Sequence, residues 1–320
     1  MKRVFALMLA LLMLLCFVAC ADDGADEDEE GQFDMAVSSD DLAWRPAENP
    51  NNDAIYYEYI NVDEIQIIGF AGSTAPHAVT VPAEIEERKV TSIAADAFKS
   101  KTNISAIELP DTVTFIGDMA FYGCTELKSV RIPAALVELG NAAFADCILL
   151  GSVALPETLE TLGFAAFYNC KSLTSAVLPA SITELPTQTF MNCQRLKTVS
   201  WSAAGTVIGD CAFMGCALLD TVNIPATLQS VGEYALSGCA ALPAVSLPAA
   251  VKTIGMCAFN ACTALNSATF AATDSWSVSQ DLHKDIDAWD EVNVSVATDA
   301  AKYLKGTYNA YYWQRVQEAQ

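Results

Sequence analysis

The stretch Ala120-Phe121-Tyr122-Gly123-Cys124 decides the fold, because a version of it returns every 23 residues along most of the chain. A phenylalanine, or in one case a leucine, marks each return. These residues are Phe98, Phe121, Phe144, Phe167, Phe190, Phe213, Leu236 and Phe259. A unit of this length that returns without a slip is typical of a solenoid, in which each repeat stacks on the next.

The columns around the phenylalanine predict the shape of one coil. Apolar residues stand five positions before it and six, nine and eleven positions after it. Positions nine and eleven alternate as in a strand with one face inward. We therefore expect a short strand in each repeat, typified by 127–133, that pairs in parallel with its counterparts about 4.8 Å away. Prolines close most of these strands, and glycines four positions before the phenylalanine are expected to supply a second turn.

Seven of the eleven cysteines form one further column, three positions after the phenylalanine. They are Cys124, Cys147, Cys170, Cys193, Cys216, Cys239 and Cys262. Cysteines of an exported protein ordinarily suggest disulfides. An odd number of cysteines at equivalent inward positions instead favours the interpretation that their side chains pack in the core as small hydrophobic groups. Cys211 and Cys257 share another column two repeats apart, roughly 9–10 Å and too far to bridge; their reactivity stays open. Without a CxxC pair, and with His77 and His283 expected on the surface of opposite caps, we predict no metal and no cofactor.

Charge excludes one class of partner. The chain has a net charge of -22, so we do not expect nucleic acid to bind. Residues 20–60 contain thirteen acids and one base, whereas the longer span 90–270 contains thirteen acids and eight bases. The acidity therefore belongs mainly to a tail, and residues 20–54 are predicted to form a disordered acidic tether.

The first 19 residues resemble a bacterial lipoprotein signal peptide. Lys2 and Arg3 precede an apolar run over 4–18 that is shorter than the ~20 residues a spanning helix needs. The run ends in Phe17-Val18-Ala19-Cys20, which is similar to a lipobox, although Leu is usual at the position of Phe17. The resemblance implies lipidation of Cys20; the alternative is a plain secretory signal. Acids directly after the cysteine resemble surface-export signals of some Gram-negative lipoproteins, or they form a solvated spacer.

Caps are expected at both ends of the solenoid, because its terminal coils expose apolar surface. Residues 55–89 are rich in strand formers and predict an N-terminal β cap. Residues 271–320 predict a C-terminal cap whose helix covers Thr298 to Val316, although its aromatic face would also suit a ligand groove. The repeats fill 90–270, with a local distortion expected near Trp201, where the usual Leu/Ile-Pro is replaced.

The stretch 116–133 resembles the BspA-like leucine-rich repeats of bacterial surface proteins. Eight repeats over 90–270 carry the resemblance. It implies a right-handed leucine-rich-repeat solenoid, often on lipoproteins or secreted proteins. It also implies a role in adhesion to host matrix proteins, host cells or other bacteria, and here an outer-membrane surface location.

The outward positions of the predicted strands form a small, nearly uncharged strip that suits a protein partner. Its candidate binding residues are Ser129, Arg131, Ser152, Ser175, Thr198, Ser200, Thr221, Asn223 and Ser246. The alternative is that small Ser and Thr simply suit closely packed strands. No nucleophile with a base in reach is visible, so we do not expect an enzyme. The hypothesis that competes with an adhesin is a structural or scaffold protein of the cell envelope.

Overall fold

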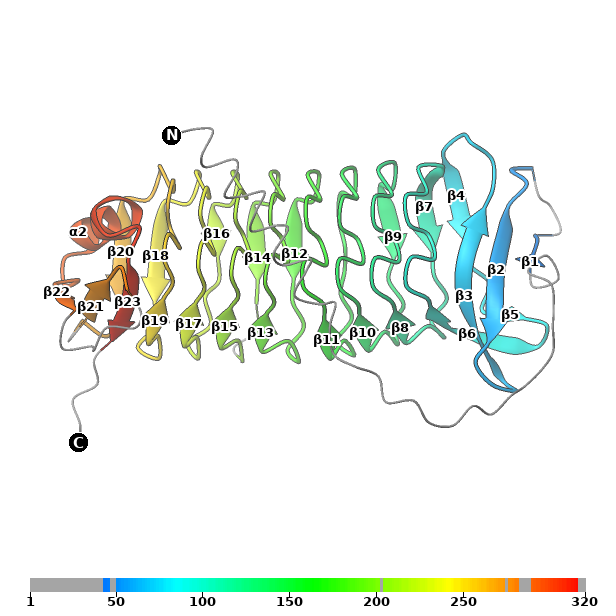
Figure 1. The fold of residues 1–320 in the computed structure, drawn as a ribbon, viewed down its shortest axis with the longest axis horizontal. Coiled ribbons are helices and arrows are strands. Elements are labelled where there is room, and N and C mark those ends of the chain that lie inside the picture. The colour runs from blue at the N-terminus through cyan, green and yellow to red at the C-terminus, as the bar shows by residue number, and fades with distance from the viewer. Residues whose placement is uncertain (1–42, 47–49, 202–203, 274–275, 282–288, 316–320) are drawn as a thin grey trace. The chain divides into compact units, whose positions relative to one another are not determined.

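The computed structural model describes residues 43–46, 50–201, 204–273, 276–281 and 289–315. The predicted signal over 1–19, Cys20 and His283 lie outside the described residues. Between 90 and 270 the chain is the expected solenoid of stacked coils (Figure 1). No helix among the described residues is long and apolar enough to cross a membrane.

One side of the solenoid is a series of parallel strands, here called the front ladder, at the predicted positions nine and eleven. Its strands are β4 (His77–Thr80), β7 (Ile104–Glu108), β9 (Ser129–Arg131), β12 (Ser175–Val177), β14 (Thr198–Ser200), β16 (Thr221–Val222), β18 (Ala244–Leu247) and β20 (Ser267–Phe270). Neighbours pair 23 residues apart, as Ser175 does with Thr198. The ladder is interrupted: the coil after β9 contributes a single bridge between Ser129 and Ser152. Gly151, which has no side chain to pack, begins that segment.

A second series of parallel strands, the back ladder, holds the aliphatic residues five positions before each phenylalanine. It runs from β6 (Arg88–Ile93) through β8 (Phe115–Ile116), β10 (Glu138–Leu139) and β11 (Thr161–Leu162), and again through β13 (Glu184–Leu185), β15 (Val207–Ile208), β17 (Ser230–Val231) and β19 (Thr253–Ile254). Each later strand has only two residues, one exposed or half-buried and one buried. Most coils are therefore hydrogen-bonded to their neighbours on two sides, but β11 and β13 do not pair, and the front ladder has no strand pairing at the same junction.

The phenylalanine turn provides a third set of backbone bonds between coils. The amide of Phe121 donates to Ala143, and that of Phe144 donates to Ala166. Left-handed backbone occurs two residues before and two after the phenylalanine, as at Met119 (φ 54°) and Gly123 (φ 70°). The glycines four residues before the phenylalanine have a different role from the predicted turn. A Cβ on Gly163 would lie 2.4 Å from backbone atoms of the preceding coil, so glycine allows the coils to approach closely.

The core contains the predicted spine. Phenylalanine rings of successive coils stack with centroids 5.0–5.8 Å apart from Phe98 to Phe213, and Leu236 ends this run. The seven cysteines of the ladder are buried, and each described cysteine is free. Packing, and not disulfide formation, therefore explains the cysteine column, as predicted.

The N-terminal cap is rich in strands, as predicted, but it begins earlier than residue 55. Strand β1 (Ala43–Trp44) pairs antiparallel with β2 (Ala54–Tyr59), which pairs with β3 (Glu64–Ala71). β5 (Glu84–Ile85) and β6 form a hairpin that leads into the back ladder. Residues 43–46 thus belong to the folded part and not to the tether, because Trp44 packs against the main core.

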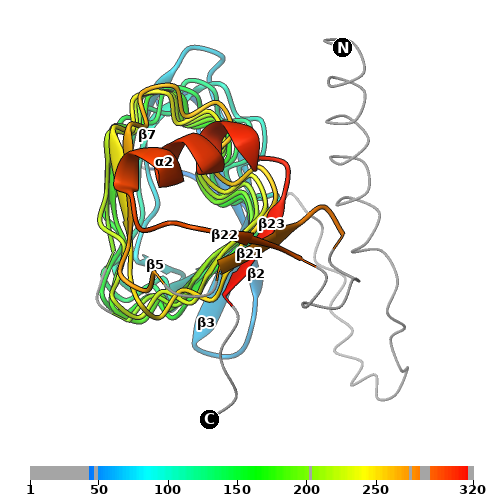
Figure 2. The same ribbon diagram turned by 90° about the vertical axis from the view of Figure 1, so that its left-hand side faces the viewer.

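The C-terminal cap contains less helix than predicted. Helix α2 (Ala297–Lys302) continues as a π-helical segment, η2 (Tyr303–Thr307), and crosses the end of the coils (Figure 2). Residues 312–315 instead form strand β23 (Tyr312–Arg315), between β19 and β21 (Trp276–Ser279), with β22 (Asp290–Val292) at the edge. Gly306 and Thr307 are weak helix formers, and burial of Trp313 in the sheet outweighs the helical pattern.

Trp201 occupies the inward position that a smaller residue fills in other repeats. Its ring is 9% exposed, and its Nε1 donates a 2.7 Å hydrogen bond to the carbonyl of Ile182. A Cβ on Gly205 would lie 2.5 Å from the indole, so the glycine at this position makes room for the ring. β14 and β16 still pair, at the regular spacing of 23 residues.

Candidate interaction surfaces

The nine candidate residues of the strip all have exposed side chains on the front ladder or directly beside it. Parallel pairing places Thr198 between Ser175 and Thr221 in one column. Ser246 accepts a 3.0 Å hydrogen bond from Thr269 of the next coil. The breaks in the ladder separate Ser129, Arg131 and Ser152 from the group around Thr198, and Ser246 follows a second break. The strip is therefore three neighbouring groups in place of one continuous sheet.

Arg131 is the single charged side chain among these nine, and its charge is balanced locally. Its Nη2 donates to Asp111 at 2.7 Å, and its Nη1 donates to the carbonyl of Leu109 at 2.9 Å. The backbone N–H of Ala134 and the Arg131 guanidinium together hold the pKa of Asp111 below its ordinary value. The N-terminal part of the strip thus carries an ion pair, and Glu108 lies beside Arg131 on the neighbouring strand.

The strip also contains an apolar side chain that is not among the nine candidate residues. Val177 pairs with Ser200 and is 58% exposed. An exposed valine among hydroxyl groups gives a partner apolar contact area beside hydrogen-bonding groups. Val177 shares its outward column of the repeat with serine and alanine, so the sequence already shows it as a larger apolar side chain in that column.

A second surface, the turn face, lies outside the phenylalanine turns and was missed from the sequence. Met119, Tyr122 and Tyr168 pack over buried alanines in a cluster separate from the main core. The floor is Ala142, Ala145 and Ala165. Phe164 beside it is 37% exposed. The residues of this face stand two positions before and one position after the phenylalanines, in columns that mix large, small and charged residues, so the sequence carried no clear signal for it.

Cys211 and Cys257 also lie in a turn-face column, with Tyr234 between them. Both side chains are buried, at 8% and 7% exposure. Burial raises the pKa of the Cys257 thiol, and a hydrogen bond with Tyr234 offsets part of that effect. A raised pKa keeps the sulfur as a thiol near neutral pH, which is the less reactive form.

His77 is not the surface residue that the sequence suggested. Its side chain is 12% exposed, and Nε2 lies 2.8 Å from Oδ1 of Asp53. Nδ1 lies 2.9 Å from the carbonyl oxygen of Ala75. Because both ring nitrogens face oxygen acceptors, neither is placed to take a proton from a substrate. Among the described residues, no three His, Cys, Asp or Glu side chains form a group that could hold a metal ion.

Comparison with known proteins gives a consistent picture. Residues 65–197 and 183–282 match the family model described as "BspA type Leucine rich repeat region", in 6 copies. No curated protein matches the sequence. Among solved structures, a leucine-rich repeat protein of T. pallidum is 28% identical with a TM-score of 0.54, over 66% of this chain and 87% of that one.

Two further solved structures are similar. A leucine-rich cell surface protein of Faecalibacterium prausnitzii is 25% identical with a TM-score of 0.52, over 73% of this chain and 56% of that chain. A leucine-rich repeat protein of Bacteroides ovatus is 23% identical with a TM-score of 0.50, over 68% of this chain and 70% of that one. The last of these supports the fold alone.

Proposed function

Because this chain belongs to the family that carries the BspA type leucine rich repeat region, a scaffold for protein–protein interaction, we propose that it is a non-catalytic cell-surface lipoprotein that binds proteins. The partners are host matrix proteins, host cell surfaces or other bacteria. The observation that carries the proposal is the exposed strip on the front ladder, from Ser129 to Ser246.

The physical properties of the strip suit a protein partner. Backbone bonds in the phenylalanine turn connect successive coils, and strand pairing on the front and back ladders adds to them over most of the solenoid, so the side chains of the strip are held without a cost for ordering loops on binding. Hydroxyl groups supply hydrogen bonds, Val177 supplies apolar area, and the Arg131–Asp111 pair leaves little charge to desolvate. Such a surface makes contacts with an extended protein face.

The anchor is proposed from the N-terminal sequence. Phe17-Val18-Ala19-Cys20 supports lipidation of Cys20, and the acids that follow support presentation away from the membrane at the cell surface. Labelling of cells with radioactive palmitate is expected to mark the wild-type protein and not the Cys20→Ala variant. Equal labelling of both proteins would remove the anchor.

Protease treatment of intact cells tests the location. We expect added protease to degrade the full-length protein while a periplasmic control protein stays intact. Complete protection of the chain until the cells are lysed would place it inside the envelope and leave the scaffold function as the better explanation. Binding of purified host matrix proteins to the same cells then separates an adhesin from a surface scaffold, which binds none of them.

A further inference from the structure

The front ladder ends, on its N-terminal side, at a strand whose outer edge has no partner strand in the described chain. β4 pairs in parallel with β7 and with no other described strand. The amides of His77 and Val81 donate to the carbonyls of Asn103 and Glu108, on the β7 side. Because successive residues of a strand direct their backbone groups to opposite sides, those of Ala78 and Thr80 face the outer edge.

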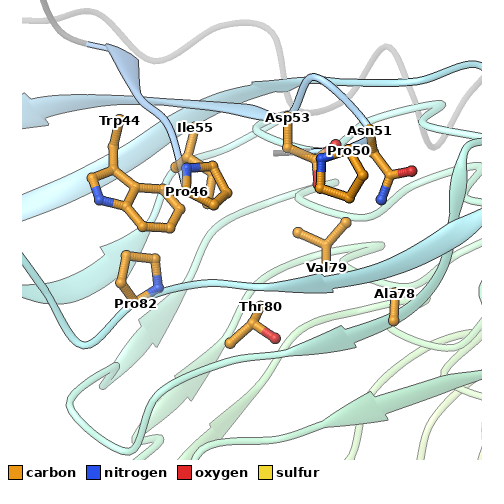
Figure 3. Close-up of a pocket in the computed structure, with 10 residues that line it drawn as sticks. All are labelled: Trp44, Pro46, Pro50, Asn51, Asp53, Ile55, Ala78, Val79, Thr80 and Pro82. Carbon is orange, nitrogen blue, oxygen red and sulfur yellow. The ribbon is translucent and has the colours of Figure 1, made fainter. Parts of the chain in front are cut away.

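A cleft runs along this outer edge. It has a volume of about 310 Å³, and Trp44, Pro46 and residues between Pro50 and Ile55 line one side of it while β4 and Pro82 line the other (Figure 3). The lining is largely apolar. It includes Trp44, Pro46, Pro50, Ile55, Val79 and Pro82. The cleft therefore offers unpaired backbone groups beside an apolar pocket.

A hydrogen-bonded pair of side chains joins the two sides of the cleft at one end. Asp53 belongs to the loop before β2, and His77 is the first residue of β4; the distance between Nε2 and Oδ1 is 2.8 Å. Since the carboxylate already faces a histidine, the cleft does not recognise its ligand by an open charge. Recognition is left to the backbone edge and to apolar contact.

We propose that this cleft binds an extended peptide segment of a partner protein, which adds to the edge of β4 as a further strand. No strand among the described residues pairs with the outward N–H and C=O groups of Ala78 and Thr80. These groups recur at the two-residue spacing of a strand, about 6.6 Å, which the backbone of an extended peptide matches. An apolar side chain of the peptide enters the pocket beside Trp44 and Pro82. This site is separate from the strip and does not depend on the proposed adhesion.

Hydrogen exchange of the full-length protein tests the first element of the proposal without any ligand. The amide of Val79, which faces β7, is expected to exchange slowly, whereas those of Ala78 and Thr80 exchange quickly. Slow exchange at Ala78 and Thr80 in the free protein would mean that the edge is already occupied, and the proposal would fail.

Peptide binding tests the second element. The probe is a capped pentapeptide, acetyl-Thr-Ser-Val-Ser-Thr-amide, compared with versions that carry Leu, Phe or Asp at the centre. We expect saturable binding by calorimetry for the apolar centres, slowed exchange at Ala78 and Thr80, and binding about tenfold or more weaker when the peptide amides are N-methylated. Absence of binding for all apolar peptides, or equal binding of the methylated peptide, would overturn the proposal.

A matched pair of variants locates the binding. Thr80→Pro removes the outward N–H at a position where an edge strand tolerates proline, and it should abolish peptide binding. Thr80→Ala keeps the N–H and should bind as the wild type does. Thr198→Arg changes the strip and not the cleft, so it should leave the affinity for the peptide unchanged. A change in peptide affinity therefore reports on the cleft, and a change in the binding of host proteins reports on the strip. Loss of binding in Thr80→Ala but not in Thr80→Pro would contradict strand addition.

Discussion

The thiol of Cys170 donates a hydrogen bond to the backbone carbonyl of Phe144 in the preceding coil, with sulfur and oxygen 3.2 Å apart. The same bond, between a cysteine and the phenylalanine or leucine 26 residues earlier, recurs in all seven coils of the cysteine column at 3.0–3.3 Å. Each thiol thus fills a small space in the core and donates a hydrogen bond to a buried carbonyl. Valine or alanine could fill the space but has no donor for the carbonyl.

Alkaline pH is expected to unfold the protein through these seven thiols. Burial raises the pKa of Cys124, Cys193 and Cys262 to about 12 and raises the other four well above the ordinary value. The unfolded chain releases the same protons near pH 8.5, so stability falls as the pH rises from there toward 12. Each thiol contributes a slope of about 1.4 kcal/mol per pH unit.

Urea unfolding between pH 7 and pH 10.5 measures this effect. The Cys193→Ala variant is the control, because it should lose the contribution of one thiol to the slope while keeping the fold. A free energy of unfolding that does not change up to pH 10.5 would contradict the burial of the thiols.

The phenylalanine spine is expected to tolerate loss of the ring but not loss of volume. Phe167→Ala should cost about 3–5 kcal/mol because it leaves a cavity between Phe144 and Phe190. Phe167→Leu should cost less than half as much, since Leu236 already fills the same column. Thermal or urea unfolding of the two variants gives the comparison, and equal destabilisation would show that ring stacking itself is the larger contribution.

Two glycines in neighbouring parts of the coil predict opposite results. In Gly163→Ala the new Cβ would meet backbone of the preceding coil at 2.4 Å, so we expect a loss of about 3 kcal/mol or more. In Gly151→Ala the nearest atom is 3.9 Å away, and the change should be within about 0.5 kcal/mol. Similar unfolding midpoints for the two variants would contradict the close approach of the coils.

The hydrogen-bonded contact between Asp53 and His77 should stabilise the N-terminal cap. Asp53→Ala leaves an imidazole nitrogen without this partner in a site that is 12% exposed, with a predicted cost of about 1–3 kcal/mol. Asp111→Ala breaks a pair that is about half exposed and screened by solvent, so it should cost less than Asp53→Ala does. The unfolding free energies of both variants at pH 7 decide whether the first pair is structural.

The solenoid was predictable because each column appears eight times, and a repeated pattern averages out the ambiguity of any one segment. The inward residues, the packing of the cysteines and the exposure of the strip could all be predicted from the position of each residue within the 23-residue repeat. The caps occur once, so tertiary contacts could override local pattern there. Trp313 joins a sheet despite a helical spacing, and Trp44 brings residues 43–46 into the fold.

The missed surfaces have a different cause. Tyr122 and Tyr168 lie outside the main core and pack over small alanines. Their columns are irregular in the sequence, and only the conformation of the turn shows which of these positions face outward. The pairing of His77 with Asp53 joins residues 24 apart that no local pattern connects. Long-range contacts of this kind require coordinates.

The most direct test of the central claim compares two exposed threonines in parallel strands on opposite ladders. Cells that display the full-length protein are tested for binding to purified host matrix proteins, with Thr198→Arg on the strip and Thr161→Arg on the back ladder as matched variants. We predict that Thr198→Arg weakens the strongest interaction about tenfold or more, whereas Thr161→Arg binds as the wild type does. Equal binding by both variants, or no binding by the wild-type protein, would contradict the claim that the strip is the surface on which partners bind.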